Sequence, residues 1–496
     1  MSDESRRSGI GEDREDETER QGVSRRQFLK AAGVLGATVG LSGGLGSVLA
    51  ACGDDEPATT TASSEATTTT TQTTTTSSEG STTSVSTGPE AGREIKIGSV
   101  SPVTGNLAVF GQAEEWSREL TLKTLGDGIV LGDGKMHKIS IEVADTQSDA
   151  QRAASVTADL VMNAKSDMLV VSGTPDTVNP ACDQAEMLEC PLVAVNNPWQ
   201  AFIFGRGANL DTEYKWIYGV FFGADQEVGL QDSVFKKIPN NKKLGVLLNN
   251  TIDGNTFAQL WVPAFEQLGY EVTFPDQYLP GAEDFTAQIS QFKKAGCELL
   301  TGQQLPPDFT NFWKQSIQQG FTPKLVNAGG MAFANFKFAE SLGNISVGFT
   351  AGFHFHRSYP YVDSLTGMTC AELCDDYEQA TGQQWAATIS VHGRLSGAID
   401  VLKRATNPED KQSIVDAIRS TNTDLIWGKT DFTAPVDKGG RHITPNAYIP
   451  DWALVQCVKG ADAKPTASKW PFDANVVAVD GHPGVEVIEP ITQQYS

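Results

Sequence analysis

The chain has 496 residues, of which 38 are lysine or arginine and 61 are aspartate or glutamate, so its formal net charge at pH 7 is −23. This surplus of acid argues against nucleic acid as a partner and against broad contact with anionic lipid, because both repel a negatively charged surface. The length is enough for two domains of ordinary size, which need no disulfide framework or structural metal to form a core.

The first 51 residues have the layout of an export signal. Arg25 and Arg26 are followed by Phe-Leu-Lys at 28–30 and then by an uncharged run at 31–51 that is dominated by Ala, Gly, Leu and Val. This order is typical of a bacterial twin-arginine signal peptide, and the run is short and rich in glycine for a membrane-spanning helix. We therefore expect residues 1–51 to be a signal peptide.

The signal ends in Leu-Ala-Ala-Cys at 49–52, which resembles the lipobox of bacterial lipoproteins. In such proteins the cysteine becomes the new N-terminus and its thiol is acylated, and each buried methylene of an acyl chain adds about 0.8 kcal/mol of membrane affinity. The resemblance implies that Cys52 anchors the mature protein to the extracytoplasmic face of the cell membrane.

A threonine- and serine-rich segment follows the lipobox, with almost pure threonine at 67–71 and 73–76. Such a segment has too few apolar side chains to offset the entropy lost on ordering. We expect residues 52–92 to be a solvated tether that lets the following domain range some tens of ångströms, at about 5–6 Å times the square root of its length.

Six further cysteines follow the tether, and two pairs of them are close in sequence. Cys370 and Cys374 are four residues apart on a predicted helix, a spacing that is awkward for disulfide geometry, so Cys182 and Cys190 are the better disulfide candidate. No cysteine or histidine spacing of a zinc site occurs, and we expect no metal.

Short strand-like runs alternate with longer amphipathic runs from about residue 93 to the end. Strict alternation predicts doubly wound α/β units, with parallel sheets covered on both faces and ligands bound at the carboxyl ends of the strands. The expected strands are 95–100, 139–144, 168–172, 192–196, 244–249 and 299–302, and the expected helices are 114–125, 151–164, 255–268, 285–295, 308–319 and 372–381.

The turns that follow these strands carry hydroxyl, amide, carboxyl and aromatic side chains. No GxSxG, HExxH or GxxxxGK[ST] motif occurs, so the turns are suited to holding a small molecule rather than to transforming one, and neither an enzyme nor a cofactor is expected. The candidate ligand-binding residues are Asn106, Phe110, Thr174, Asp176, Thr177, Asn196, Asn197, Trp199, Asp253, Gln303, Gln304 and Asp308.

Residues 95–111, IKIGSVSPVTGNLAVFG, resemble the opening of type I periplasmic solute-binding proteins of the leucine/isoleucine/valine-binding class, which serve ABC importers. Further matches follow in the order typical of that family, and together they span most of the chain from 94 to about 460. They are Asp-Phe-Thr at 284–286, Gly-Phe-Thr-Pro at 320–323, Ala-Ile-Arg-Ser-Thr at 417–421, Gly-Lys-Thr-Asp-Phe at 428–432 and Gly-Gly at 439–440.

The resemblance implies two α/β lobes joined by three crossings, with a solute trapped between them. One lobe would comprise 93–220 plus 352–424, and the other 221–351 plus 425–496. The partners would be the solute and the permease and ATPase subunits of an ABC importer, with no nucleic acid. The alternative is a sensory module that signals ligand occupancy to a membrane partner, and transport is favoured because no output domain follows.

The expected ligand contacts depart from those of amino-acid binders. Asn-Asn-Pro-Trp at 196–199 replaces small residues, and no acid lies at 328–331, where the family's partner for a substrate ammonium would fall. Asp308 or Asp253 could substitute. We therefore expect a ligand other than an α-amino acid, with Trp199 as an aromatic contact.

Overall fold

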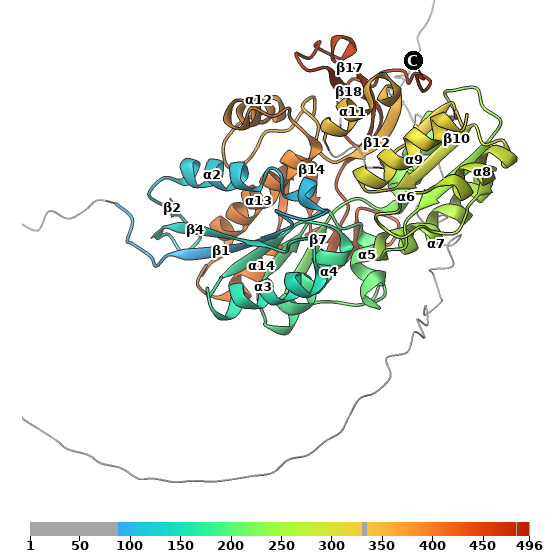
Figure 1. The fold of residues 1–496 in the computed structure, drawn as a ribbon. Helices are drawn as coiled ribbons and strands as arrows, with labels where there is room; N and C mark the ends of the chain where they lie inside the picture. The colour runs from blue at the N-terminus through green and yellow to red at the C-terminus, as the bar shows by residue number, and fades with distance from the viewer. Residues whose placement is uncertain (1–87, 330–334, 483, 496) are drawn as a thin grey trace, which may run out of the picture.

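The computed structural model describes residues 88–329, 335–482 and 484–495 (Figure 1). The signal peptide, Cys52 and the tether up to residue 87 lie outside the described residues. Within the described part, the chain forms two α/β lobes, each built on a seven-stranded sheet, and two small two-stranded ribbons. This arrangement confirms the expected fold class of two doubly wound lobes.

The sheet of the first lobe has the order β15-β16-β7-β6-β5-β1-β4. All neighbours are parallel except β15 and β16, which pair antiparallel. The strands are β1 (Ile95–Ser101), β4 (Ile139–Asp145), β5 (Met168–Val171), β6 (Leu192–Ala194), β7 (Ile217–Val220), β15 (His442–Thr444) and β16 (Ala447–Tyr448). The ribbons are β2 (Ile129–Val130) with β3 (Met136–His137), and β13 (Asn422–Leu425) with β14 (Gly428–Asp431).

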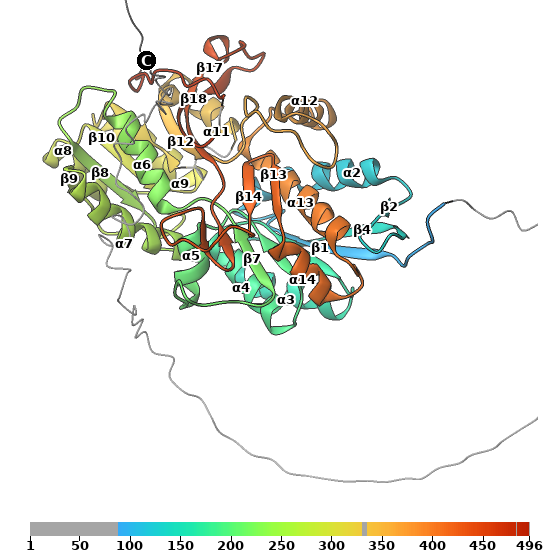
Figure 2. The same cartoon turned by 180° about the vertical axis from the view of Figure 1, so that it is seen from behind.

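Helices cover both faces of this sheet because alternate strand residues point to opposite sides. In β5, Met168 and Val170 share a core with α2 and α13, whereas Leu169 and Val171 share a core with α3 and α4. Figure 2 shows α13 and α14 on the near face of this lobe. The helices are α2 (Glu114–Leu125), α3 (Ala150–Met162), α4 (Pro175–Met187), α5 (Trp199–Ile203), α12 (Cys370–Thr381), α13 (Val391–Arg404) and α14 (Lys411–Arg419), with short 3-10 turns η1 (Ala108–Gly111), η2 (Phe204–Arg206) and η4 (Ala387–Ser390).

The second lobe has the sheet order β18-β17-β12-β11-β10-β8-β9, in which β17 and β18 are antiparallel and the other strands are parallel. Its strands are β8 (Lys243–Leu248), β9 (Glu271–Thr273), β10 (Leu299–Gln303), β11 (Leu325–Asn327), β12 (Phe349–Phe353), β17 (Trp452–Lys459) and β18 (Phe472–Asp480). Its helices are α6 (Ala224–Phe235), α7 (Ile252–Gln267), α8 (Thr286–Ala295), α9 (Pro306–Gln318) and α11 (Lys337–Leu342), with 3-10 turns η3 (Gly343–Ser346) and η5 (Gly460–Asp462).

The chain crosses between the sheets three times, after β7, after β12 and between β16 and β17. The third crossing lies further along the chain than the boundary expected between residues 424 and 425. Ala447 and Tyr448 pair with Gly219 and Val220, so β15 and β16 extend the first sheet although they fall within 425–496, the segment expected in the second lobe. The chain returns to the second lobe only at Trp452, where β17 begins.

A buried ion pair joins β1, the first strand of the first lobe, to helices on one face of that lobe's sheet. Arg394 of α13 pairs with Glu114 of α2, and Ser99 of β1 donates to the other carboxylate oxygen of Glu114 at 2.6 Å. Arg394 and Glu114 are each only 1% exposed. Loss of one partner would leave the other charge buried without compensation.

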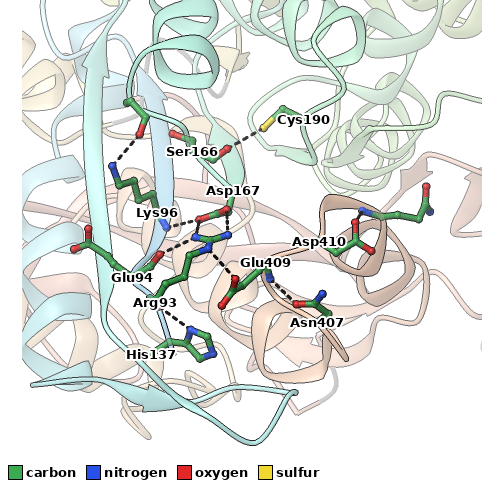
Figure 3. Close-up of polar contacts among 12 residues, drawn as sticks. Arg93, Glu94, Lys96, His137, Ser166, Asp167, Cys190, Asn407, Glu409 and Asp410 are labelled. Carbon is green, nitrogen blue, oxygen red and sulfur yellow. Dashed lines mark hydrogen bonds and ion pairs between the residues drawn. The ribbon is translucent and has the colours of Figure 1, made fainter. Parts of the chain in front are cut away.

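A second polar cluster fixes the start of the first lobe (Figure 3). Arg93 binds Asp167 through two hydrogen bonds of 3.0 and 2.7 Å, and it also lies 3.2 Å from Glu409. The backbone N–H of Lys96 donates to the same Asp167 at 2.8 Å. The domain therefore becomes rigid where the expected tether ends.

The expected disulfide between Cys182 and Cys190 is contradicted, because both are free and buried. Cys182 lies in α4, which continues to Met187. The five residues of helix that follow Cys182, at about 1.5 Å of rise each, separate it from Cys190. Cys190 instead donates to the carbonyl oxygen of Ser166 at a sulfur–oxygen distance of 3.7 Å (Figure 3). Burial raises the pKa of each of these two thiols to about 12.

Replacement of Arg394 tests the buried pair. We expect Arg394→Ala to lower the free energy of unfolding by about 3–5 kcal/mol, because it strands the Glu114 carboxylate in the core. Urea denaturation measures the change. The double variant Arg394→Met with Glu114→Gln removes both charges and should lose less. A loss below about 1 kcal/mol for Arg394→Ala would show that the pair does not hold α2 and α13 together.

Candidate functional site

A cavity of about 60 Å³ lies between the two lobes, at the carboxyl ends of their strands. This is where parallel α/β sheets place their binding sites, because the turns after the strands converge there. The first lobe contributes η1, the β5–α4 and β6–α5 turns and η4, and the second lobe contributes the start of α7 and the end of β10. The lining residues are Phe110, Gly173, Thr174, Pro175, Asn196, Pro198, Phe221, Phe222, Asp253, Gln303, Gly352, His354, Ala387, Thr388 and Trp452.

All three crossings reach this cavity. The first supplies Phe221 and Phe222, the second supplies His354 and the third leads into Trp452. Phe222 and Trp452 stack with ring centroids 4.1 Å apart, and Phe221 meets His354 edge-on at 4.8 Å. These four residues, which we call the aromatic wall, connect the cavity directly to the segments about which the lobes would move.

Glu227 holds the aromatic wall in place. Its fully buried carboxyl group accepts a hydrogen bond from the Trp452 indole at 2.7 Å and others from Gln231 at 3.2 Å and Asn327 at 3.4 Å. A Cβ on Gly352 would lie 2.3 Å from a Glu227 carboxyl oxygen and 2.6 Å from the Trp452 ring, so only glycine fits at that position. Burial raises the pKa of Glu227, and its three donors oppose that shift.

The polar side chains that line the cavity have unused hydrogen-bonding capacity. Each of the six carries a buried polar atom without a partner among the described residues. A buried polar group left unpaired costs about 1–3 kcal/mol, so such groups gathered around one cavity indicate a site that a polar ligand completes. The atoms are Thr174 Oγ1, Asn196 Oδ1, Asp253 Oδ1, Gln303 Oε1, His354 Nε2 and Thr388 Oγ1.

Local structure explains how two of these groups reach the cavity. Asn196 follows β6 at a φ of 59°, a left-handed conformation that asparagine tolerates, and its amide nitrogen donates to Ser172 at 2.7 Å. Asp253 lies in the first turn of α7, whose start is capped by Thr251 accepting from the Gly254 N–H at 3.1 Å. Both side chains are therefore positioned by the backbone of a turn.

Two carboxyl groups approach each other across the cleft. Burial raises the pKa of Asp253 to about 8, and the charge of Asp176 on the opposite lobe adds to the shift. Burial also raises the pKa of Asp176, an effect that the Ile252 N–H opposes by hydrogen bonding to its carboxylate. His354 has a pKa lowered by burial to about 3, so its imidazole is neutral at physiological pH.

The structure brings five of the candidate binding residues to the cavity, namely Phe110, Thr174, Asn196, Asp253 and Gln303. The other candidates lie outside the cavity lining. Asn106 is exposed, Asp176 lies beside Asp253, Thr177 bonds back to Thr174, Asn197 donates to Asn179, Trp199 donates to Asp225, Gln304 donates to Leu247, and Asp308 accepts from Gly281. Of the two acids considered as a partner for an ammonium group, Asp253 is the one that faces the cavity.

Sequence reasoning did not place the crossing residues or Thr388 in the site. Phe221 and Phe222 directly follow the first expected lobe boundary, at the end of an aromatic-rich stretch, which was the available signal. Trp452 and Thr388 lie in segments without a strand–turn–helix pattern that points to a ligand. Only the return of the chain at the second and third crossings brings them to the cavity.

One buried set of groups has the composition of a hydrolase triad. Ser117 Oγ lies 3.2 Å from His392 Nδ1, and His392 Nε2 lies 3.4 Å from Asp363 Oδ2. All three residues are at most 1% exposed, and none lines the cavity. The set joins α13 to α2 in the buried interior and lies outside the cavity lining, so it is part of the packing.

Residues 88–329, 335–482 and 484–495 contain no cluster of three or more metal-ligating side chains. The same residues include no helix with the length and apolar character needed to cross a bilayer.

Two lobes, three crossings and a cavity between them define a cleft-type binding protein. A profile described as periplasmic binding protein matches residues 94–461, and a profile of the twin-arginine translocation signal matches residues 22–42. The chain belongs to the periplasmic binding protein family. Both the family and the type of export signal expected from the sequence are thereby confirmed.

Relatives share the fold at low sequence identity. The Leu/Ile/Val-binding protein homolog 1 of Brucella suis is 22% identical over 389 residues, which cover 77% of this chain and 95% of the relative. The leucine-binding protein LivK of Thermotoga maritima has a TM-score of 0.63 at 19% identity and covers 78% of this chain and 98% of its own. A solute-binding protein of an ABC transporter from Rhodopseudomonas palustris, in complex with 3,4-dihydroxybenzoic acid, has a TM-score of 0.62 at 16% identity. The match covers 80% of this chain and 99% of the relative.

Replacement of Glu227 tests how the aromatic wall is held. We expect Glu227→Ala to lower the free energy of unfolding by about 3 kcal/mol, because it leaves the Trp452 indole and two amide groups without their acceptor. Glu227→Gln keeps an acceptor for the indole and should lose about 1 kcal/mol. Urea denaturation followed by tryptophan fluorescence measures both. Equal losses in the two variants would contradict the role of the carboxyl oxygen.

Proposed function

We propose that this protein is the solute-binding subunit of an ABC importer, which captures a small molecule between its lobes and presents it to a membrane permease and its ATPase. The observation that carries the proposal is the set of six unpaired polar groups in one aromatic-walled cavity between the lobes. A solute that bonds to groups of both lobes would favour the closed form over an open one. The relatives described as ABC transporter solute-binding proteins support the same role.

Contacts between the lobes describe the closed arrangement that a permease would recognise. Asn335 of the second lobe donates to Gln112 of the first at 3.1 Å, and Lys337 donates to Gln383 at 3.0 Å. On the other side of the cleft, α7 packs against α4 and α5. Apolar contacts accompany these polar ones, since Phe336 of the second lobe meets the ring of Trp385 in the first lobe edge-on at 5.3 Å.

The cavity suits a small solute. At about 10–15 Å³ for each water, a volume of about 60 Å³ holds roughly four to six waters, or a ligand group of similar size. A Streptococcus pneumoniae relative was crystallised with isoleucine and the Rhodopseudomonas palustris relative with an aromatic acid. We propose a ligand that is not an α-amino acid, because Asn196 and Pro198 occupy the turn where small residues are usual.

We further propose that the mature protein is anchored to the outer face of the cell membrane through Cys52. The twin-arginine signal that contains Arg25 and Arg26 supports export, and the lipobox ending at Cys52 supports acylation. The Thr/Ser-rich tether would then give the binding domain freedom to reach its permease. In a cell without an outer membrane, such an anchor would prevent loss of the protein by diffusion.

A solute screen followed by tryptophan fluorescence tests the binding function. We expect a saturable change on titration with one class of small amines, amides, urea-like solutes or aromatic acids, and no product. Trp452 lines the cavity, so Trp452→Phe should remove most of the change, whereas Trp313→Phe, in the core of the second lobe, should retain it. Tight binding of leucine or isoleucine would contradict the proposed ligand class.

The anchor is tested by Cys52→Ala expressed with the signal peptide intact. Without the thiol no acyl chain is attached, so we expect the exported protein to move from the membrane to the soluble fraction. Cys297→Ala, which changes a cysteine of the second lobe, is the matched control and should stay with the membrane. Membrane association of processed Cys52→Ala protein would overturn the anchor.

A further inference from the structure

The charge of the cavity restricts the solute. No lysine or arginine lines the cavity in residues 88–329, 335–482 and 484–495, and the sequence of 330–334 is Gly-Met-Ala-Phe-Ala, which contains no basic residue. The one imidazole in the lining, His354, is neutral. A solute carboxylate transferred from water into this cavity would have no cation to compensate the loss of its hydration.

The two helix starts beside the cavity, those of α4 and α7, each already carry an acid in the first turn, Asp176 and Asp253. A helix N-terminus binds anions through its free N–H groups, and α4 begins beside the cavity. Its first residue, Pro175, has no N–H, and its second residue, Asp176, places a carboxyl group in the first turn. The protein's own carboxylate therefore takes the place that an anionic solute would need.

Three of the six unpaired atoms of the lining are carbonyl or carboxyl oxygens, and the other three are two threonine hydroxyls and the His354 Nε2. Asp253 and Gln303 face the cavity from the second lobe, each with a buried oxygen that has no partner among the described residues. Asn196 presents its carbonyl oxygen from the first lobe, since its amide nitrogen bonds to Ser172. All three side chains are at most 6% exposed. Such a set is completed by a group that donates several hydrogen bonds.

Lobe closure brings two acids together. Asp176 lies on α4 of the first lobe and Asp253 on α7 of the second, and the charge of Asp176 disfavours ionisation of Asp253. A positive charge between them would remove this repulsion and would tie the lobes to each other. The aromatic wall and Phe110 would surround the rest of the solute, where ring faces also favour a cation.

We infer that the solute carries a cationic nitrogen, as an ammonium or amidinium group and without a carboxylate, and that this group binds Asp253 at the side of the cleft where Asp176 approaches it. The inference rests on the proposed solute-binding function and names its ligand class. Binding and closure are then linked by the same charge, because the cation is needed to bring the two acids together.

Matched probes test the ligand class by isothermal titration calorimetry at pH 7. The probes are n-butylamine, butyramide and butyrate, and benzylamine, benzamide and benzoate, which share a skeleton and differ in the charge of the polar group. We expect each amine to bind at least tenfold more tightly than the carboxylate of the same skeleton. Asp253→Asn should weaken amine binding at least tenfold, while Asp284→Asn, an exposed acid before α8, should leave it unchanged.

The same titration also measures the protons that are released when the amine binds. Asp253 has a pKa of about 8 and must lose its proton to face a cation, so amine binding at pH 7 should release protons and should strengthen as the pH rises from 6 to 8. Titrations in two buffers of different ionisation enthalpy measure the release. The other titratable groups near Asp253 are Asp176 on α4 and neutral His354.

The outcomes separate this inference from the proposed function. Tighter binding of the carboxylates or the amides would overturn the cationic ligand and would leave the solute-binding function standing. Equal amine binding by Asp253→Asn, with its fold verified by circular dichroism, would also overturn it. Failure of all six probes, together with a negative fluorescence screen, would overturn both.

Discussion

The cavity depends on one buried carboxyl group, that of Glu227. It lies just after the first crossing and accepts hydrogen bonds from Trp452, which follows the third crossing, and from Asn327 of the second sheet. A carboxyl group at this depth is costly unless all its donors are present, so its bonds determine how the crossings pass one another. Because Trp452 stacks on Phe222, the same bonds determine the shape of the aromatic wall. The binding surface and the segments that would carry lobe motion are therefore one structure.

The chemistry of the cavity is that of a binding site. Its polar groups come from six different segments and have unpaired atoms, yet no nucleophile with an adjacent base faces the cavity from the described residues. The set that has such a composition, Ser117 with His392 and Asp363, is buried between helices away from the cleft. An aromatic wall with polar groups opposite is suited to holding a small solute.

Much of the fold could be predicted because parallel strands buried on both faces appear as short apolar runs. The expected helix over 114–125 and the strands near 95, 168 and 299 agree with the structure within one residue at each end. Turns after such strands are also predictable, so the sequence itself points to Thr174, Asn196, Asp253 and Gln303, which line the cavity. Predictions that depended on the distance between two elements were less accurate. Cys182 and Cys190 are near in sequence, yet the rest of α4 separates them.

The sequence alone determined the family, the export signal and the order of strands and helices, because these depend on local patterns and on motifs in a set order. Tertiary structure decided which turn residues share a cavity, since Thr388 and Trp452 reach it only through the second and third crossings. It also decided that 442–448 belongs to the first sheet, because pairing of β16 with β7 is a contact between residues more than 200 positions apart. The approach of Asp176 to Asp253 is likewise a property of two lobes facing each other. Local patterns carry no information about such distances.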